Sequence, residues 1–166
     1  MLVKPLDNGQ SAFVADEPVG EPDACLICDK HRRGDAADGG ILYEDDLVYA
    51  GHVHGRNKAY RGWLIVEPKR HAPGLGGLTD DEACAVGRLS NRLARVLKQT
   101  VEAEHVYAFV FGDGVPHLHV HHAPRYPHTP IEFWGAQLSQ WPDAPRIDEA
   151  EMRALVTTLR DRLGRE

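Results

Sequence analysis

The sequence predicts an α+β fold in which an antiparallel sheet carries one long helix on one of its faces. Three observations lead to this class: several short apolar runs end at Gly or Pro, short turns separate most of them, and one long amphipathic stretch interrupts the series. A chain of 166 residues can bury one substantial core, so a single domain is expected.

Strands are predicted where apolar or aromatic residues form short runs between turn-forming residues. The runs cover residues 41–43, 47–54, 62–67, 106–111 and 117–124. Pro68 ends the third run, because proline cannot donate a hydrogen bond to a sheet ladder. Gly112-Asp113-Gly114 predicts a tight hairpin turn, so residues 106–111 should form a buried strand that leads directly into the last one.

Two capping boxes predict the starts of two helices. Thr79, followed by Glu82, begins a long helix whose apolar stripe predicts docking on the sheet. The stripe consists of Val86, Leu89, Leu93, Val96, Leu97 and Val101. Asp148, followed by Glu151, begins a final amphipathic helix that ends near Gly164.

Composition divides the chain into three segments. Residues 1–23 contain scattered proline and glycine without a sustained period, so an extended N-terminal arm is expected. The main folded unit covers residues 24–126. Residues 127–166 add a proline-rich, irregular segment and the C-terminal helix, which we expect to pack on the same domain.

Charge and hydropathy restrict the possible partners. No run approaches the roughly 18 consecutive apolar residues that a membrane span requires, and the first residues lack the layout of a signal peptide, so a cytoplasmic protein is expected. A net charge of -6 argues against binding to a nucleic acid polymer, which needs a concentrated basic face. A small phosphate ligand is compatible with the local cations Lys69, Arg70 and Arg125.

Two of the three cysteines, Cys25 and Cys28, form a C-x-x-C pair. In a cytosolic chain this spacing indicates either half of a zinc site or a redox pair. Zinc is preferred, because a redox pair would follow a buried strand and the residues before Cys25 look irregular. A polar, glycine-rich link should then lead to Gly40. Cys84 falls on the side of the long helix away from its apolar stripe and is interpreted as an incidental thiol.

Histidines occupy alternate positions in the last predicted strand. Side chains two apart share one face of a strand, so His117, His119 and His121 should form one row while the apolar residues between them pack behind it. Each two-residue step advances roughly 6.5 to 7 Å, so three imidazoles cannot easily bind one ion. A neighbouring pair could bind one, which would leave another imidazole free as a nucleophile or proton carrier.

This pattern resembles the signature of the histidine triad (HIT) family of nucleotide hydrolases and transferases, with His122 and Ala123 in its last two positions. Other segments resemble family landmarks in the expected order, and together they cover about residues 24–126. These landmarks are Cys25-Leu-Ile-Cys28, Tyr43-Glu-Asp45, the stretch from Trp63 to His71, and Pro124-Arg-Tyr126. The resemblance implies a curved antiparallel sheet with the long helix on one face, usually in a two-fold homodimer.

The resemblance also implies a structural zinc ion and a set of ligands for it. Zinc-bearing members of the family use positions that correspond here to Cys25, Cys28, His71 and His117. Such a site needs four thiolate or imidazole ligands in a tetrahedron. This assignment takes one imidazole from the histidine row and leaves the other two free.

The same resemblance implies that His119 attacks the α-phosphorus of a nucleotidyl small molecule, such as a phosphoramidate or a dinucleoside polyphosphate. The product would be a covalent nucleotidyl-histidine, which water then hydrolyses. His121 would contact the phosphate or assist proton transfer to the leaving group. Backbone amides at Gly112, Gly114 and Val115 could donate hydrogen bonds to phosphate oxygens.

Two segments depart from the family pattern, and both concern the substrate rather than the reaction class. Many members carry an acidic residue after the second strand that holds the ribose, whereas residues 52–57 here contain no carboxylate. The loop before the triad usually offers Gln or Ser to the phosphate, whereas this chain has Asp113-Gly-Val-Pro116. A carboxylate beside a phosphate is unfavourable unless it faces away. His122 should point to the opposite face, as packing or surface.

Two other interpretations stay open at this point. The zinc could be catalytic, with an H-x-H pair and another ligand holding a metal-bound water. Alternatively, the chain could be a zinc-stabilised nucleotide-binding module without turnover, as the altered ribose and phosphate loops suggest.

Overall fold

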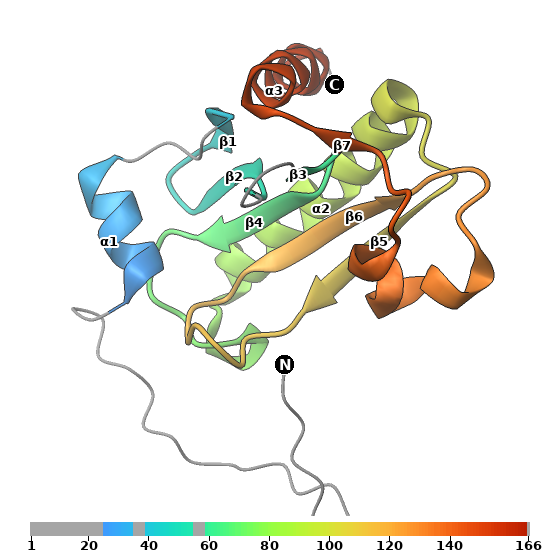
Figure 1. Cartoon of the computed structure of the whole chain (residues 1–166). Helices are drawn as coiled ribbons and strands as arrows, with labels where there is room; N and C mark the ends of the chain where they lie inside the picture. The colour runs from blue at the N-terminus through green and yellow to red at the C-terminus, as the bar shows by residue number, and fades with distance from the viewer. Residues whose placement is uncertain (1–24, 35–38, 55–58, 166) are drawn as a thin grey trace, which may run out of the picture.

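A five-stranded antiparallel sheet forms the centre of the computed structural model, which describes residues 25–34, 39–54 and 59–165 (Figure 1). The strand order is β1-β2-β4-β6-β5. The strands are β1 (Ile41–Glu44), β2 (Val48–His52), β4 (Leu64–Pro68), β5 (His105–Val110) and β6 (Val120–Arg125). The predicted α+β class is therefore confirmed, while the predicted arm over residues 1–23 lies outside the described residues.

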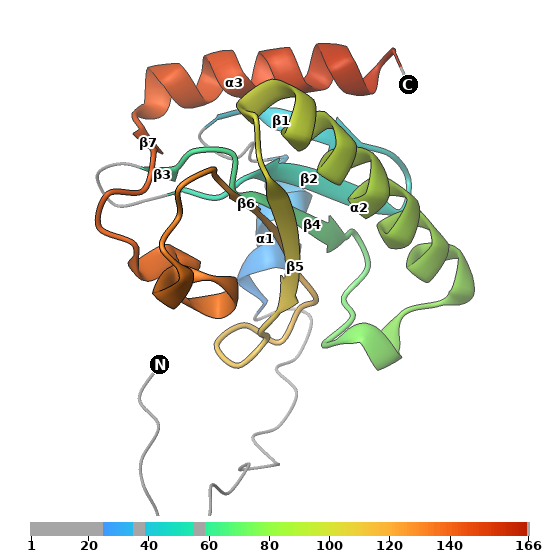
Figure 2. The same ribbon diagram turned by 90° about the vertical axis from the view of Figure 1, so that its right-hand side faces the viewer.

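The long helix α2 (Asp80–Val101) covers one face of this sheet, as the sequence predicts (Figure 2). Its capping box is complete, because Thr79 and Glu82 each accept a hydrogen bond from the other's backbone amide. All six residues of the predicted stripe are buried, and Leu93 and Leu97 have no exposed surface. Each such leucine contributes about 1.5–3 kcal/mol relative to an exposed position, so the stripe anchors the helix.

The C-terminal part of the chain packs against α2, β1 and β3 (Ala59–Tyr60). Helix α3 (Glu149–Leu163) begins at the predicted capping box and packs against α2 and β1 (Figure 2). Before it, residues 127–146 form two 3-10 helices, Ile131–Phe133 and Gly135–Gln140. A two-stranded sheet of β3 and β7 (Arg146–Ile147) attaches this segment to the rest. Strands this short carry no sequence period, so the pattern does not predict them.

No helix in the described ranges is long and apolar enough to cross a membrane.

The expectation of a polar link after the cysteine pair is wrong. Residues Leu26–Arg33 form helix α1, with Cys25 at its N-cap and Gly34 in the left-handed conformation at its C-cap. This helix buries none of its residues, so it lacks the apolar stripe that would reveal it in the sequence.

Two expectations about the last pair of strands are also wrong. Strand β5 lies at the edge of the sheet, and all of its residues are partly buried or exposed. A loop over residues 111–119, rather than a tight hairpin, connects it to β6. His117 and His119 therefore precede the strand. The Leu118 amide donates to the Ala72 carbonyl oxygen at 2.6 Å, which holds this part of the loop against the chain that follows β4.

His122 lies on the face of β6 that is turned toward the core. It pairs in register with Leu64 and is only 2 % exposed, and neither ring nitrogen has a hydrogen-bond partner among the described residues. Burial lowers its pKa to about 4. In the unfolded chain the same imidazole has a pKa near 6.5. The free energy of unfolding that depends on His122 is therefore fully present above pH 6.5 and is lost as the pH falls toward 4.

We expect His122→Leu to remove this pH dependence and to keep or raise stability at neutral pH, since a buried unpartnered imidazole is costly. Between pH 7.5 and 5 the wild type should lose about 2 kcal/mol more than the variant. Urea unfolding at both values measures this difference. His105→Leu, at an exposed position of β5, is the control and should behave as the wild type. Equal losses in the wild type and His122→Leu would contradict the assignment.

Candidate functional site

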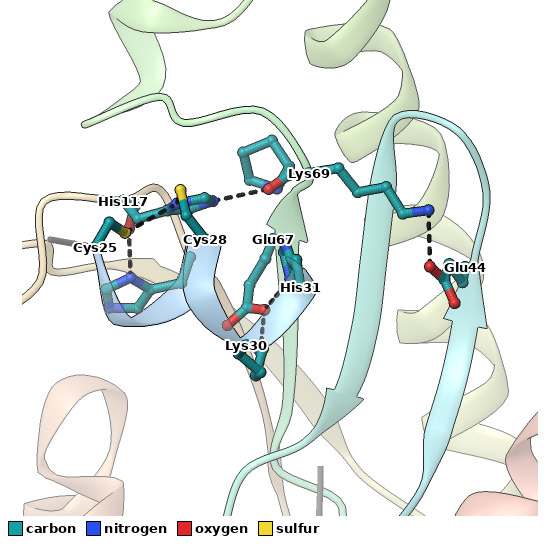
Figure 3. A network of polar contacts seen from close by, with 10 residues as sticks. Cys25, Cys28, Lys30, His31, Glu44, Glu67, Lys69 and His117 are labelled. Carbon is teal, nitrogen blue, oxygen red and sulfur yellow. Dashed lines mark hydrogen bonds and ion pairs between the residues drawn. The ribbon is translucent and has the colours of Figure 1, made fainter. Parts of the chain in front are cut away.

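Four side chains from distant parts of the sequence meet beside the end of β4. They are Cys25 and Cys28 at the start of α1, His71 after β4, and His117 in the loop before β6. Their ligand atoms all lie within 4.8 Å of one another. The Cys28 sulfur is 3.4 Å from Nδ1 of both histidines, and the Cys25 sulfur is 3.5 Å from Nδ1 of His117 (Figure 3). The structure thus brings together the four residues that the resemblance implies.

Local structure orients these ligand atoms. One turn of α1 puts Cys25 and Cys28 on the same side, since residues three apart are neighbours on a helix. Nε2 of His117 lies 2.8 Å from the Pro68 carbonyl oxygen. A carbonyl can only accept, so Nε2 carries the proton and Nδ1 turns its lone pair toward the thiols.

The residues present fit a tetrahedral ion with sulfur and nitrogen ligands. Zn–S bonds of about 2.3 Å and Zn–N bonds of about 2.0–2.1 Å set neighbouring S and N atoms roughly 3.6 Å apart. The observed separations of 3.4–3.5 Å are close to that edge length. Burial, followed by the adjacent Cys25, raises the pKa of Cys28 to about 11. Two thiolates side by side at this position therefore need a cation to neutralise them. The two sulfur and two nitrogen donors form a site that is compatible with zinc.

A buried carboxylate ties α1 to the sheet next to this cluster. Glu67 of β4 is 3 % exposed and forms ion pairs with Lys30 and with Nε2 of His31, the latter at 3.0 Å (Figure 3). Burial alone would raise the pKa of Glu67, but the hydrogen bond from His31 and the charge of Lys30 hold it below its usual value. The His31 ring also meets His117 edge to face at 5.9 Å. The helix that carries the cysteines is thus held by polar contacts.

The three cations that the sequence suggests for a phosphate each meet a carboxylate instead. The pairs are Lys69 with Glu44 at 2.7 Å, Arg70 with Glu82 at 2.6 Å, and Arg125 with Glu104 at 3.2 Å. Figure 3 includes the first of them. Arg125 also stacks on Trp134 at 3.9 Å. These side chains stabilise the fold and leave little charge for a ligand.

His119 is partly buried and lies outside the four-residue cluster. Its Nδ1 donates to the His117 carbonyl oxygen at 2.7 Å. A neutral imidazole has one N–H and one lone pair, so this bond leaves the lone pair on Nε2. His119 is thereby prepared as a nucleophile or a proton acceptor.

His121, on β6, is oriented by a tryptophan that the sequence analysis does not single out. Trp63 Nε1 donates to Nδ1 of His121 at 3.1 Å, so the proton of the neutral ring lies on Nε2. Burial, followed by the nearby His119, lowers the pKa of His121 to about 4, which keeps the ring neutral near pH 7. The rings of His119 and His121 meet edge to face at 5.2 Å. Sequence spacing gives no signal for the contact between Trp63 and His121, because the two residues lie far apart in the chain.

A cavity of about 260 Å³ adjoins His121. Its lining consists of Val53, His54, Tyr60, Trp63, His121, Ser139 and Arg146. None of the described residues that line it carries a carboxylate, and the sequence over residues 52–57 has none either. Ser139 and Arg146 come from the C-terminal segment and are not candidates in the sequence analysis.

The loop proposed as a phosphate cradle is accessible. Gly114 is exposed, Gly112 and Val115 are partly exposed, and Asp113 is exposed. None of the described residues accepts a hydrogen bond from the amides of Gly112, Gly114 or Val115.

Comparison with known proteins assigns the family. The model of the HIT domain matches residues 35–128, which is more than half of the chain. The protein therefore belongs to the histidine triad (HIT) family, whose members are typically nucleotide hydrolases or transferases. The match covers the histidine triad and His71 but neither Cys25 and Cys28 nor the C-terminal segment. No curated protein matches the sequence.

Solved structures share the fold at low sequence identity. A Zn-bound histidine triad family protein from Mycobacterium smegmatis is 19% identical with a TM-score of 0.62, over 87% of this chain and 96% of that one. A hypothetical histidine triad nucleotide-binding protein from Sulfolobus tokodaii is 18% identical with a TM-score of 0.64, over 85% of this chain and 93% of that one. A Hit-like protein involved in cell-cycle regulation from Bartonella henselae is 18% identical with a TM-score of 0.63, over 84% of this chain and 96% of that one.

Proposed function

We propose that this protein is a nucleotide hydrolase or nucleotidyltransferase that acts at the α-phosphorus of its substrate through His119. The observation that carries the proposal is the hydrogen bond from Nδ1 of His119 to the His117 carbonyl oxygen, which in the neutral ring puts the lone pair on Nε2. A neutral imidazole nitrogen is a nucleophile at physiological pH. The substrate class is a phosphoramidate, a dinucleoside polyphosphate or a related nucleotidyl donor.

The reaction proceeds in two displacements. The lone pair on Nε2 of His119 forms a bond to the α-phosphorus. The bond from phosphorus to the leaving group breaks with its electron pair on the leaving group, which takes up a proton from solvent. Water then attacks the phosphorus, the P–N bond breaks, and the pair returns to Nε2. The nucleoside monophosphate leaves with the oxygen of that water, and its protons pass to phosphate and solvent.

His121 assists by binding the phosphate. Because Trp63 donates to its Nδ1, the proton on Nε2 can donate to a phosphate oxygen. A ring with a pKa near 4 is neutral at pH 7, which favours this contact over proton delivery to the leaving group. The unpaired amides of Gly112, Gly114 and Val115 supply further donors for the same oxygens.

A structural zinc ion, held by Cys25, Cys28, His71 and His117, is the second part of the proposal. Four protein ligands close a tetrahedral site, whereas a catalytic site keeps a position open for water. Only His117 of the triad belongs to the cluster, so the observed ligand set argues against catalytic zinc on an H-x-H pair. When bound, the ion neutralises the two thiolates and joins α1 to the loop before β6.

A zinc-stabilised module without turnover is the competing function. The cavity without a carboxylate and the exposed Asp113 support this alternative, since both alter the part of the site that would hold a nucleotide. The orientation of His119 favours turnover, because simple binding does not need a ring held by Nδ1 with its other nitrogen left for a nucleophilic lone pair.

We further propose that the protein acts as a cytoplasmic homodimer joined along β5. This strand is the edge of the sheet, and Val110 and Phe111 at its end are 41 % and 46 % exposed. The rings of Tyr107, Phe109 and Phe111 stack along one side of it with 5.6 Å between successive centroids. An exposed apolar edge strand is a template for pairing with a second copy.

His119→Ala should lower kcat/KM by at least about 10³-fold, because the covalent step is lost. Wild type incubated with a panel of nucleotidyl donors and quenched in alkali should carry a nucleotidyl adduct on the peptide that contains His119, and mass spectrometry detects it. The variant should lack the adduct and retain its zinc. His105→Ala, on exposed β5, is the control. Binding of a nucleoside monophosphate without turnover of any donor by the wild type would favour the binding module.

Cys28→Ser should lose zinc and stability, because removing one ligand of a closed site leaves the second thiolate uncompensated. A loss of about 3 kcal/mol corresponds to roughly 6–12 °C in Tm for a chain of this length. Elemental analysis and thermal unfolding measure both effects. Cys84→Ser is the matched control, since this thiol is exposed on α2. Chelation should likewise lower Tm, whereas immediate, metal-restorable loss of activity at unchanged stability would indicate catalytic zinc.

Val110→Lys should convert the dimer to a monomer, because a charge is then placed on the pairing edge. Sedimentation equilibrium gives the mass of each species. Leu75→Lys changes an apolar residue that is 59 % exposed elsewhere on the surface, and this control should stay dimeric. A monomeric wild type would refute the proposed assembly.

A further inference from the structure

The cavity beside His121 has a wall that comes from outside the part of the chain matched by the family model. Ser139 and Arg146 form this wall, whereas the match ends at residue 128. Arg146 lies on β7 and pairs in register with Tyr60 of β3, which also lines the cavity. The Arg61 amide donates to the Pro145 carbonyl oxygen at 2.9 Å, which extends the attachment. The position of Arg146 is therefore set by backbone hydrogen bonds.

Packing behind β7 supports the same position. Trp141, Ala144 and Ile147 are buried in the hydrophobic core on either side of Arg146 along the chain. The exposed arginine is thus carried by a segment that is itself anchored. The backbone at Arg146 therefore needs no rearrangement when the side chain binds a ligand.

Arg146 has no carboxylate partner among the described residues. Its hydrogen bond within these ranges is a long one, 3.5 Å to the Ser139 carbonyl oxygen. The described part of the cavity lining contains no Asp or Glu either. In contrast, Lys69, Arg70 and Arg125 are each neutralised by an acidic side chain. The cavity therefore offers an uncompensated cation whose planar fork suits a phosphate.

The anion that fits Arg146 is not the phosphate under attack. His119 would bond to that phosphorus, and His119 does not line the cavity. His121 connects the two places, since it lines the cavity and its ring meets that of His119 at 5.2 Å. Trp63 and Tyr60, whose rings meet edge to face at 5.5 Å, add aromatic surface to the same cavity.

We propose that Arg146 determines substrate specificity by binding a second phosphate group, distinct from the phosphate that His119 attacks. The substrate class is thus a nucleotidyl donor with an additional phosphate, and this inference rests on the proposed function. Two sources share the chemistry: a phosphate on the ribose, or a further phosphate in a polyphosphate chain. The positive charge of Arg146 attracts either one, whereas a carboxylate in the same cavity would repel it.

Kinetics with three donors tests the proposal: an adenosine 5′-phosphoramidate, the same compound with a 3′-phosphate, and a diadenosine triphosphate. Arg146→Ala should raise KM about tenfold or more for a donor with the second phosphate, at nearly unchanged kcat, and alter the simple phosphoramidate by no more than about twofold. Arg146→Lys should recover part of the loss, because it keeps the charge without the fork. The donor that responds identifies the source of the phosphate.

Arg162→Ala removes the same charge from an exposed position of α3 and should leave all three donors unaffected. Thermal unfolding of each variant separates loss of binding from loss of folding, and Arg146→Lys stands in for Arg146→Ala if the latter unfolds. Equal effects of Arg146→Ala on all three donors, or no effect on any, would overturn the proposal.

Equilibrium binding separates this proposal from the proposed function. Adenosine 3′,5′-bisphosphate or adenosine 5′-triphosphate should bind the wild type at least about tenfold more tightly than adenosine 5′-monophosphate, and Arg146→Ala should abolish that difference. This binding result without turnover of any donor would support the Arg146 site and contradict the catalytic role of His119. Turnover of a donor with equal affinity for all the nucleotides would support the role of His119 and contradict the Arg146 site.

Discussion

Two backbone carbonyl groups hold neighbouring histidines of the triad in opposite tautomers. Pro68 accepts from Nε2 of His117, and His117 in turn accepts from Nδ1 of His119. The first ring therefore presents Nδ1 to the thiols, and the second, when neutral, has its lone pair on Nε2. Since a strand would place both rings on one face at similar depth, the loop conformation before β6 is what separates a ligand from a candidate nucleophile.

Polar contacts, rather than apolar packing, attach α1 to the rest of the domain. This helix buries none of its own residues, so hydrophobic packing does not hold it. Its attachment rests on Cys25 and Cys28 at one end and on the ion pairs of Lys30 and His31 with buried Glu67 along it. An ion at the cysteine end would complete the attachment, because two adjacent thiolates repel each other without one. A bound ion would thus connect this helix to the loop that carries His117.

The C-terminal segment contributes to the site rather than only to stability. Through the short pairing of β3 with β7, it brings Ser139 and Arg146 to the cavity beside His121. The family domain by itself would leave this side of the cavity open.

The sequence by itself determined the features that depend on local periodicity and capping: the α+β class, helices α2 and α3 with their capping boxes, and the apolar stripe that docks α2. Its motifs also pointed to the four members of the cysteine and histidine cluster. Only the tertiary structure decided the tautomers of His117 and His119, the contact of Trp63 with His121, and the place of Arg146. These depend on groups far apart in the chain that approach within hydrogen-bonding or cavity distance, which no sequence period encodes.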